Sequence, residues 1–315
     1  MEIGYSLSSE ELHPTEMVRW AKRAEELGFR SAWVSDHFHP WVDRQGQRPF
    51  VWSAIGGIAA TTELRVGTAV TCPLIRMHPA IVAHAAATSA AMMPGRFFLG
   101  VGTGEALNEH VLGDKWPPAE VRLEMLDEAD AEIRKLWEGG QQSHEGKYYR
   151  VENARLYTLP EEPVPVMVSA FGEKSAQLAG RIGEGYIGTS PEADLLAKFD
   201  AAGGAGKPKF AGVKACWATD EAAARRTAYE LWPNLGISGQ LSQELALPAL
   251  FEQAAELVAE ERVARKVACG PDPERHLDML RKYADAGYDA VFIHQIGPDQ
   301  DDFLRFYAKE VLPKV

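Results

Sequence analysis

The sequence contains little cysteine. Only Cys72, Cys216 and Cys269 occur among 315 residues, and none belongs to a CxxC pair or lies beside paired histidines. Disulfide-stabilised scaffolds need several cysteines, and structural zinc sites need closely spaced Cys and His ligands. We therefore expect neither a disulfide framework nor a metal site.

Long apolar runs and an excess of positive charge are also absent. The stretch AIVAHAAATSAAMM at 80–93 is shorter than the ~20 residues of a membrane span, and the N-terminus has no basic and then apolar signal region. Lys and Arg number 33 against 45 Asp and Glu, so the net charge is −12. Proteins that bind nucleic acid or anionic membranes need a basic surface. We expect a cytoplasmic protein with a small-molecule partner, and a small anionic ligand would need only a local cluster of donors.

Short β-rich runs alternate with helical segments along the whole chain. The predicted strands are rich in Val, Ile, Phe and Tyr, and several are continuous apolar runs typical of strands buried on both faces. They are Glu2–Leu7, Ser31–Asp36, Leu64–Val70, Arg96–Gly102, Pro165–Ala170, Gly185–Gly188, Phe210–Ala218 and Ala290–His294. At least one helix is predicted after each strand, which indicates a parallel sheet with right-handed crossovers.

Eight such units favour an α/β fold of the (β/α)8 TIM-barrel type over an open doubly wound sheet. Length alone suggests about two domains at ~150 residues each, but barrels of ~250 residues form one. We predict a single domain over residues 1–315 with insertions near 114–159 and 234–266.

A barrel places its chemistry at the carboxyl ends of the strands. Polar residues and turns follow nearly every predicted strand: Ser8–Glu10, Asp36–Trp41, Thr71–Pro73, Gly102–Asn108, Ala170–Gly172, Thr189–Ser190 and His294–Gln295. Together they predict an enzyme site at one mouth of the barrel.

The Asp36-His37 pair is the most suggestive of these. A histidine at a strand end can act as a general base near neutral pH when a neighbour fixes its tautomer. The alternative is that the pair caps a loop. Trp41 would add an aromatic wall, although such an indole can equally serve packing.

Gly100, Gly102 and Gly104 do not form a dinucleotide fingerprint, because Glu105 occupies the third glycine position of GxGxxG, and GxxxxGK[ST] is absent as well. The glycines do permit a flat ligand to approach the backbone. Glu105 would make an acid/base pair with His37 if the two faced each other, which spacing does not decide. The turn at 169–172 leads into a helix and suits either a phosphate or an ordinary βα connection.

Six segments carry a resemblance to a known family: IGYSLSSEEL, VSDHFHPW, TAVTCPLIRMHPAIVAHA, PGRFFLGVGTGEALNE, GKYYRVENARLYTLP and VPVMVSAFGEKSAQLAGRIGEGYIGTS. The chain resembles the luciferase-like superfamily, in its branch of dehydrogenases that use the deazaflavin coenzyme F420. The segments span most of the first 190 residues, and the remainder matches more loosely.

The resemblance implies roles for four residues. His37 would take the proton of the substrate hydroxyl while the carbon delivers a hydride to the deazaflavin, and Glu105 would protonate the ring. Trp41 would orient the reacting groups, and Glu10 would orient the substrate or assist proton flow. This division of roles is consistent with hydride transfer, because the base and the cofactor must lie on either side of the carbon that is oxidised.

The resemblance also implies the coenzyme contacts and a homodimer. Asp36, Ala69, Val70, Cys72 and Asn108 would hold the ring, with a non-prolyl cis peptide at Ala69–Val70. The coenzyme phosphate would be bound by the turn residues Ser169, Ala170, Phe171 and Gly172.

One segment departs from the sugar-phosphate enzymes. They follow the sixth-strand Thr-Ser with Gly-Lys, whereas this chain has Thr189, Ser190, Pro191 and Glu192. Losing that cation removes a charge-assisted contact of about 1.5–3 kcal/mol, and a carboxylate repels a phosphate. We expect Thr189 and Glu192 to contact a neutral alcohol or sugar, unless Arg265 and Lys266 supply compensating charge.

Two alternatives stay open at this point. One is an FMN-dependent monooxygenase or reductase of the same superfamily, and the other is a non-catalytic flavin-binding barrel. The pairing of His37 with Glu105 suits oxidation of an alcohol better than the reactions of an FMN-dependent monooxygenase or reductase. The presence of all four candidate catalytic residues disfavours a non-catalytic barrel.

Overall fold

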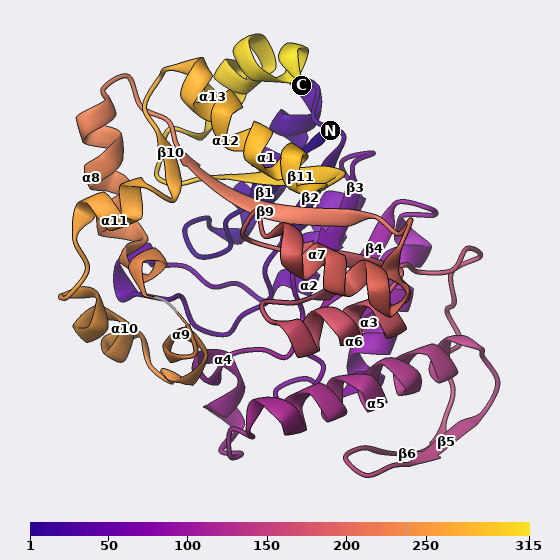
Figure 1. The fold of residues 1–315 in the computed structure, drawn as a ribbon. Coiled ribbons are helices and arrows are strands. Elements are labelled where there is room, and N and C mark those ends of the chain that lie inside the picture. Colours follow the sequence, from indigo (N-terminus) through magenta and orange to yellow (C-terminus); the bar gives the residue numbers. More distant parts are fainter. Residues whose placement is uncertain (238) are drawn as a thin grey trace.

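Eight parallel strands close into a barrel in the computed structural model, which describes residues 1–237 and 239–315 (Figure 1). The strands run in the order β11, β1, β2, β3, β4, β7, β8 and β9, and β9 pairs with β11 to complete the ring. Their bounds are β1 Glu2–Leu7, β2 Ser31–Val34, β3 Arg65–Thr68, β4 Phe97–Val101, β7 Val166–Ser169, β8 Gly185–Gly188, β9 Lys209–Cys216 and β11 Ala290–Gln295. The predicted (β/α)8 barrel is confirmed.

Helices surround the strands (Figure 1). They are α1 Pro14–Glu26, α2 Val51–Ala59, α3 Pro79–Met92, α4 Ala106–Glu109, α5 Ala119–Trp137, α6 Glu173–Ile182, α7 Ala193–Phe199, α8 Glu221–Leu231, α9 Leu241–Glu244, α10 Pro248–Ala255, α11 Glu260–Ala264, α12 Pro273–Ala286 and α13 Gln300–Phe306. Among residues 1–237 and 239–315, no helix is long and apolar enough to cross a membrane.

The two segments predicted as insertions differ in kind. Residues 114–159 contain α5, which packs against α3 and α6, and then the antiparallel hairpin of β5 (Gln142–Glu145) and β6 (Arg150–Ala154). Residues 234–266 contain α9, α10 and α11, with residue 238 outside the described residues. They lead into β10 (Val267–Cys269), an additional strand beside β9 that the sequence did not predict. It makes Cys216 and Cys269 register partners, and both are free, buried thiols.

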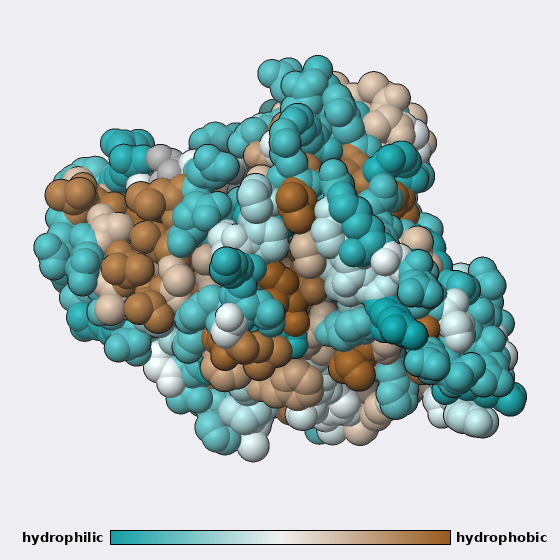
Figure 2. Space-filling view, turned by 90° about the horizontal axis from the view of Figure 1, so that it is seen from below, coloured by the Kyte–Doolittle hydropathy of each residue, from teal (hydrophilic) through white to brown (hydrophobic). Residues whose placement is uncertain are grey.

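Apolar side chains gather on the side of the molecule where Figure 1 places α9 and α10 (Figure 2). These helices and the segment between them carry the exposed Leu241, Leu247 and Leu250. Such clustering on a surface is typical of an interface.

Aromatic rings fill the interior of the barrel. Trp33 and Phe292 stack with centroids 4.1 Å apart, and Phe98 and Phe210 pack beside them. Glycines on the strands leave room for these rings: a Cβ built at Gly67 would lie 2.2 Å from the Phe98 ring.

Gly67→Ala should therefore destabilise the protein by about 1–3 kcal/mol through overpacking. The matched control is Gly56→Ala in α2, where a Cβ meets nothing within 4 Å. This helical change should be neutral or stabilise by up to about 1 kcal/mol. Urea denaturation of both variants measures the difference, and equal midpoints would contradict the interior packing described above.

Candidate active site

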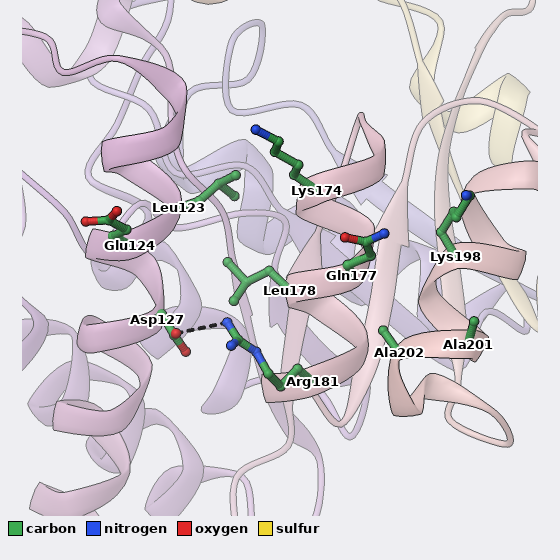
Figure 3. A pocket seen from close by; sticks show the side chains of 10 residues that line it. All are labelled: Leu123, Glu124, Asp127, Lys174, Gln177, Leu178, Arg181, Lys198, Ala201 and Ala202. Atoms are coloured by element: carbon green, nitrogen blue, oxygen red, sulfur yellow. Dashed lines mark hydrogen bonds and ion pairs between the residues drawn. The ribbon is translucent and has the colours of Figure 1, made fainter.

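Two cavities stand out, and one lies on the outside of the barrel. This groove of about 670 Å³ is formed by side chains of α5, α6 and the segment around α7 (Figure 3). Arg181 bonds Asp127 across it at 2.9 Å, and Lys174 and Lys198 border it. No residue at a strand end contributes to its lining, so the strand-end chemistry lies elsewhere.

The second cavity, of about 1950 Å³, lies at the carboxyl ends of the barrel strands. We call it the mouth pocket. It exceeds the ~300–1,000 Å³ typical of a site for one small ligand, so it can hold a long cofactor together with a substrate. Most of the predicted site residues line it: Glu10, His37, Trp41, Ala69, Val70, Glu105, Ser169, Phe171, Gly172, Thr189 and Glu192.

His37 and Glu105 face each other inside the mouth pocket, which sequence spacing could not show. His37 Nε2 lies 3.6 Å from Glu105 Oε2, and the Trp41 ring meets the imidazole edge-on at 5.2 Å between centroids. Burial lowers the pKa of His37, and the Arg48 guanidinium lowers it further. Burial, together with the Glu109 carboxylate, raises the pKa of Glu105 to about 7. Near neutral pH the pair therefore combines a neutral imidazole with a carboxyl whose pKa is close to the surrounding pH.

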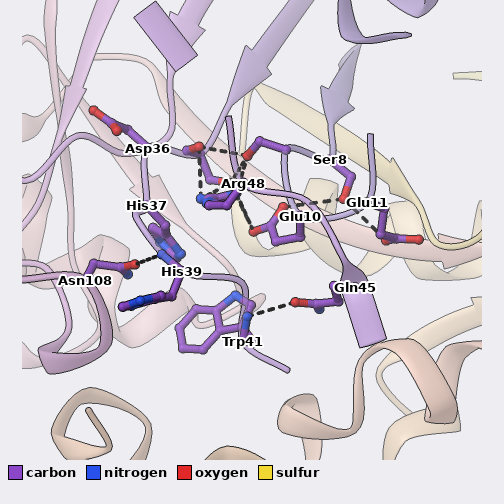
Figure 4. A network of polar contacts seen from close by, with 12 residues as sticks. Ser8, Glu10, Glu11, Asp36, His37, His39, Trp41, Gln45, Arg48 and Asn108 are labelled. Atoms are coloured by element: carbon purple, nitrogen blue, oxygen red, sulfur yellow. Dashed lines mark hydrogen bonds and ion pairs between the residues drawn. The ribbon is translucent and has the colours of Figure 1, made fainter. Parts of the chain in front are cut away.

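Glu10 is fully ionised near neutral pH, unlike Glu105, because its pKa is lowered rather than raised. Arg48 Nη1 lies 3.2 Å from Glu10 Oε1, and both side chains are almost completely buried (Figure 4). Although burial opposes ionisation, the Arg48 charge lowers the pKa of Glu10 to about 2. Arg48 also donates to Ser9 Oγ and, at 3.0 Å, to the Ser35 carbonyl, so it ties the ends of β1 and β2 together.

Four predicted residues lie behind the pocket lining. Asp36 accepts from Thr71 Oγ1 at 2.9 Å and pairs with Arg76 at 3.0 Å. Asn108 Oδ1 accepts from the backbone N–H groups of Phe38 and His39, at 2.9 and 3.1 Å. The structure thus places both side chains where they shape the loop that carries His37.

The other two are also buried. The thiol of Cys72 lies under Gly104, where a Cβ would come within 2.6 Å of its sulfur. The carbonyl of Ala170 accepts from Tyr186 at 2.9 Å. Beside them, Ala69 and Val70 line the pocket and are joined by the predicted non-prolyl cis peptide.

Sequence reasoning missed three cations at or beside the pocket. Lys214 lines it, Arg48 pairs with Glu10 and Arg76 pairs with Asp36. Arg48 and Arg76 lie in long loops beyond β2 and β3, and Lys214 lies within β9. None directly follows a predicted strand. Arg76 lies within the segment 68–85 that carries the family resemblance, whereas no pattern in the sequence distinguishes Arg48 and Lys214 from other cations.

Comparison with known proteins agrees with this geometry. The family model of luciferase-like monooxygenases matches residues 1–290. The chain belongs to the luciferase-like monooxygenase family. The F420-dependent glucose-6-phosphate dehydrogenase of Microbacterium testaceum (strain StLB037) is 37% identical to it, with 100% of this chain and 97% of that protein covered. The protein of the same description from Nocardia farcinica (strain IFM 10152) is 35% identical, with 100% and 98% covered.

Solved structures share the fold as well. An F420-dependent secondary alcohol dehydrogenase in complex with an F420-acetone adduct superimposes with a TM-score of 0.92 at 29% identity, with 98% of each chain covered. The oxygenating constituent of 3,6-diketocamphane monooxygenase from Pseudomonas putida, in complex with FMN, gives 0.71 at 18% identity, with 100% and 98% covered. The second likeness concerns the fold alone. The predicted resemblance to this family is confirmed.

The raised pKa of Glu105 predicts a pH-dependent stability. The folded state holds this proton up to about pH 7, whereas an ordinary carboxyl releases it near 4.5. The resulting stabilisation is complete below pH 4.5 and is lost as pH rises to 7, by up to about 3 kcal/mol. The free energy of unfolding of Glu105→Gln, relative to that of the unmodified protein, should therefore rise between pH 4.5 and 7 and stay constant above pH 7. Urea denaturation across this range, with the exposed-site variant Glu138→Gln as control, measures the effect. A difference that does not change with pH would contradict it.

Proposed function

We propose that this protein is a coenzyme F420-dependent dehydrogenase that transfers a hydride from a hydroxyl-bearing substrate to the deazaflavin. The observation that carries the proposal is the His37–Glu105 pair, in which one pocket holds a neutral base 3.6 Å from a carboxyl with a pKa of about 7. Oxidation of an alcohol needs a base, because one proton leaves the hydroxyl while the hydride leaves the carbon, and the carboxyl can supply the proton that the ring takes up with the hydride. The names of the relatives agree with such a reaction.

The residues of the mouth pocket fit a deazaflavin coenzyme. Nδ1 of His37 is buried and has no hydrogen-bond partner among the described residues, so a ligand has an unsatisfied group to meet. Gly102 lines the pocket where a Cβ would come within 2.7 Å of Val70, which leaves a flat surface for a ring. Ser169, Phe171 and Gly172 line the pocket at the N-terminus of α6, where backbone N–H groups suit a phosphate. When bound, the deazaflavin would supply the hydride acceptor.

Each polar residue then has a separate task. His37 accepts the hydroxyl proton on an imidazole nitrogen, because burial keeps it neutral. Glu105 donates a proton from its carboxyl group toward the coenzyme ring. Glu10 remains ionised beside Arg48 and orients the substrate hydroxyl, and Trp41 confines the imidazole from the side.

The substrate class that we favour is a neutral alcohol or a sugar without phosphate. Glu192 lines the mouth pocket beside Thr189 and brings a negative charge to the place where an anionic substrate would need a cation. Arg225 and Arg275 line it too, but they pair with Glu260 at 3.6 Å and with Glu221. Arg265 and Lys266, the cations that could compensate for the missing lysine, both line the pocket, as does Lys282. They share this lining with Glu261, Asp272 and Asp278, so the charge is of mixed sign. Such a wall disfavours a phosphate dianion.

Mixing the protein with oxidised coenzyme F420 and an alcohol should bleach the visible absorbance of the deazaflavin. His37→Ala should lower kcat by about 10²–10⁴, the range for loss of a general base, with little change in coenzyme affinity. His84→Ala, on the exposed face of α3, is the control. The alcohol panel includes glucose and glucose 6-phosphate.

Coenzyme affinity weaker than micromolar, or tighter binding of FMN, would refute the proposal. Equal losses of turnover and coenzyme affinity in His37→Ala would refute the role of the base.

We also propose a cytoplasmic homodimer. The three cysteines are free thiols, the state that a reducing compartment maintains. The exposed leucines at and between α9 and α10, with Ile81 and Met92 on α3, offer apolar surface for a second copy. Light scattering after gel filtration should give about twice the chain mass of 34.6 kDa. A monomeric mass at micromolar concentration would contradict the dimer.

A further inference from the structure

Lys214 is a cation within the mouth pocket that the mechanism above does not use. It lies on β9, and its side chain lines the pocket together with Trp232 and His294. Burial lowers the pKa of its ammonium group to about 8, because the charged form loses its contacts with water. Lysines are seldom withdrawn from water without a partner, so its contacts require an explanation.

Two sides of the Lys214 ammonium group have a partner within the protein. Lys214 Nζ lies 3.1 Å from Nδ1 of His294 and 3.7 Å from the centroid of the Trp232 ring. A lysine ammonium has three N–H donors. Within the chain described, residues 1–237 and 239–315, no third acceptor lies at hydrogen-bond distance. One N–H group is thus left for a molecule in the pocket.

Glu11 fixes the orientation of this lysine through His294. Glu11 Oε1 lies 3.0 Å from His294 Nε2 and accepts from Trp232 Nε1 at 2.7 Å, while Oε2 accepts from the Gly297 N–H at 2.7 Å. A carboxylate only accepts, so the imidazole proton is on Nε2 and the lone pair of Nδ1 faces Lys214. Burial, together with the Lys214 charge, lowers the pKa of His294 and keeps it neutral.

This network is continuous with the candidate catalytic residues. Ser8 Oγ lies 3.4 Å from Glu10 Oε2 and 3.3 Å from Glu11 Oε1, so it bridges the two carboxylates. Glu10 and its partner Arg48 form one end of the polar chain (Figure 4), and Lys214 forms the other. Both ends belong to the same pocket, since Glu10 and Lys214 line it together.

We propose that Lys214 is a substrate-binding residue that selects substrates with a second oxygen beside the hydroxyl that is oxidised. Its free N–H group donates to that second oxygen, whereas a plain alkanol would displace water and leave the donor unpaired. The substrate class is therefore a diol, polyol or hydroxy-carbonyl compound rather than a simple secondary alcohol. That one of the two oxygens belongs to the hydroxyl group that is oxidised rests on the proposed function.

The test compares trans-cyclohexane-1,2-diol with cyclohexanol, which share a ring and differ by one hydroxyl. Tryptophan fluorescence, with Trp232 against Lys214, reports binding without coenzyme. Hydrophobic transfer favours the mono-alcohol, so tighter binding of the diol requires a polar partner. We expect the unmodified protein to bind the diol at least tenfold more tightly, and Lys214→Met to lose this preference. Lys209→Met, on the same strand but paired with Asp200 at 3.0 Å, should retain it.

A second variant, Lys214→Gln, covers the case in which the methionine variant fails to fold, and its preference should fall below threefold. With coenzyme present, Lys214→Met should raise KM for the diol about tenfold, change kcat less than threefold and leave the mono-alcohol unaffected. Equal binding of both ligands by the unmodified protein, or a preference that survives both substitutions, would overturn the inference. A diol preference without any reduction of the coenzyme would refute the proposed function alone, and turnover without a preference would refute this inference alone.

Discussion

The buried ion pair between Arg48 and Glu10 is the interaction on which the site depends. Removing two charges from water is costly, and the cost is offset only where every donor finds good geometry. Arg48 meets this condition in part. Its two terminal nitrogens reach Glu10 and Ser9 after β1 and Ser35 after β2, whereas its buried Nε has no hydrogen-bond partner among the described residues. The same guanidinium keeps Glu10 ionised and helps to keep His37 neutral. One cation in a loop thus joins two strand ends and sets two protonation states.

The pocket separates two carboxylates by environment rather than by residue type. Glu10 lies against a cation and has a pKa of about 2, whereas Glu105 is buried near Glu109 and has a pKa of about 7. Titratable groups whose environments push their pKa values apart are typical of acid/base assignments in enzymes. The properties of Lys214 are likewise set by its surroundings. A neutral imidazole and the face of an indole ring lie against its ammonium group and leave one N–H donor for a ligand.

Much of the fold could be predicted from the sequence. The eight barrel strands lie where apolar β-rich runs predicted them, because strands buried on both faces need such runs. β10 was missed because three residues directly after a helical stretch carry no periodic signal, and its pairing with β9 is a long-range contact. The hairpin of β5 and β6 was missed because its strands are polar and lie outside the barrel. Most of the predicted strand-end residues line one pocket, whereas Asp36, Cys72, Asn108 and Ala170 lie behind its lining.

The sequence by itself determined the βα alternation, the family and which residues follow the strands, since all of these are local patterns. The tertiary structure alone decided that His37 and Glu105 lie 3.6 Å apart and that Asp36 and Asn108 support a loop from behind the pocket. It also decided that Lys214 lines the pocket and that Arg48 pairs with Glu10, which lines it too. These properties depend on burial and on contacts between segments distant in the chain, and neither is encoded in the spacing of residues along it.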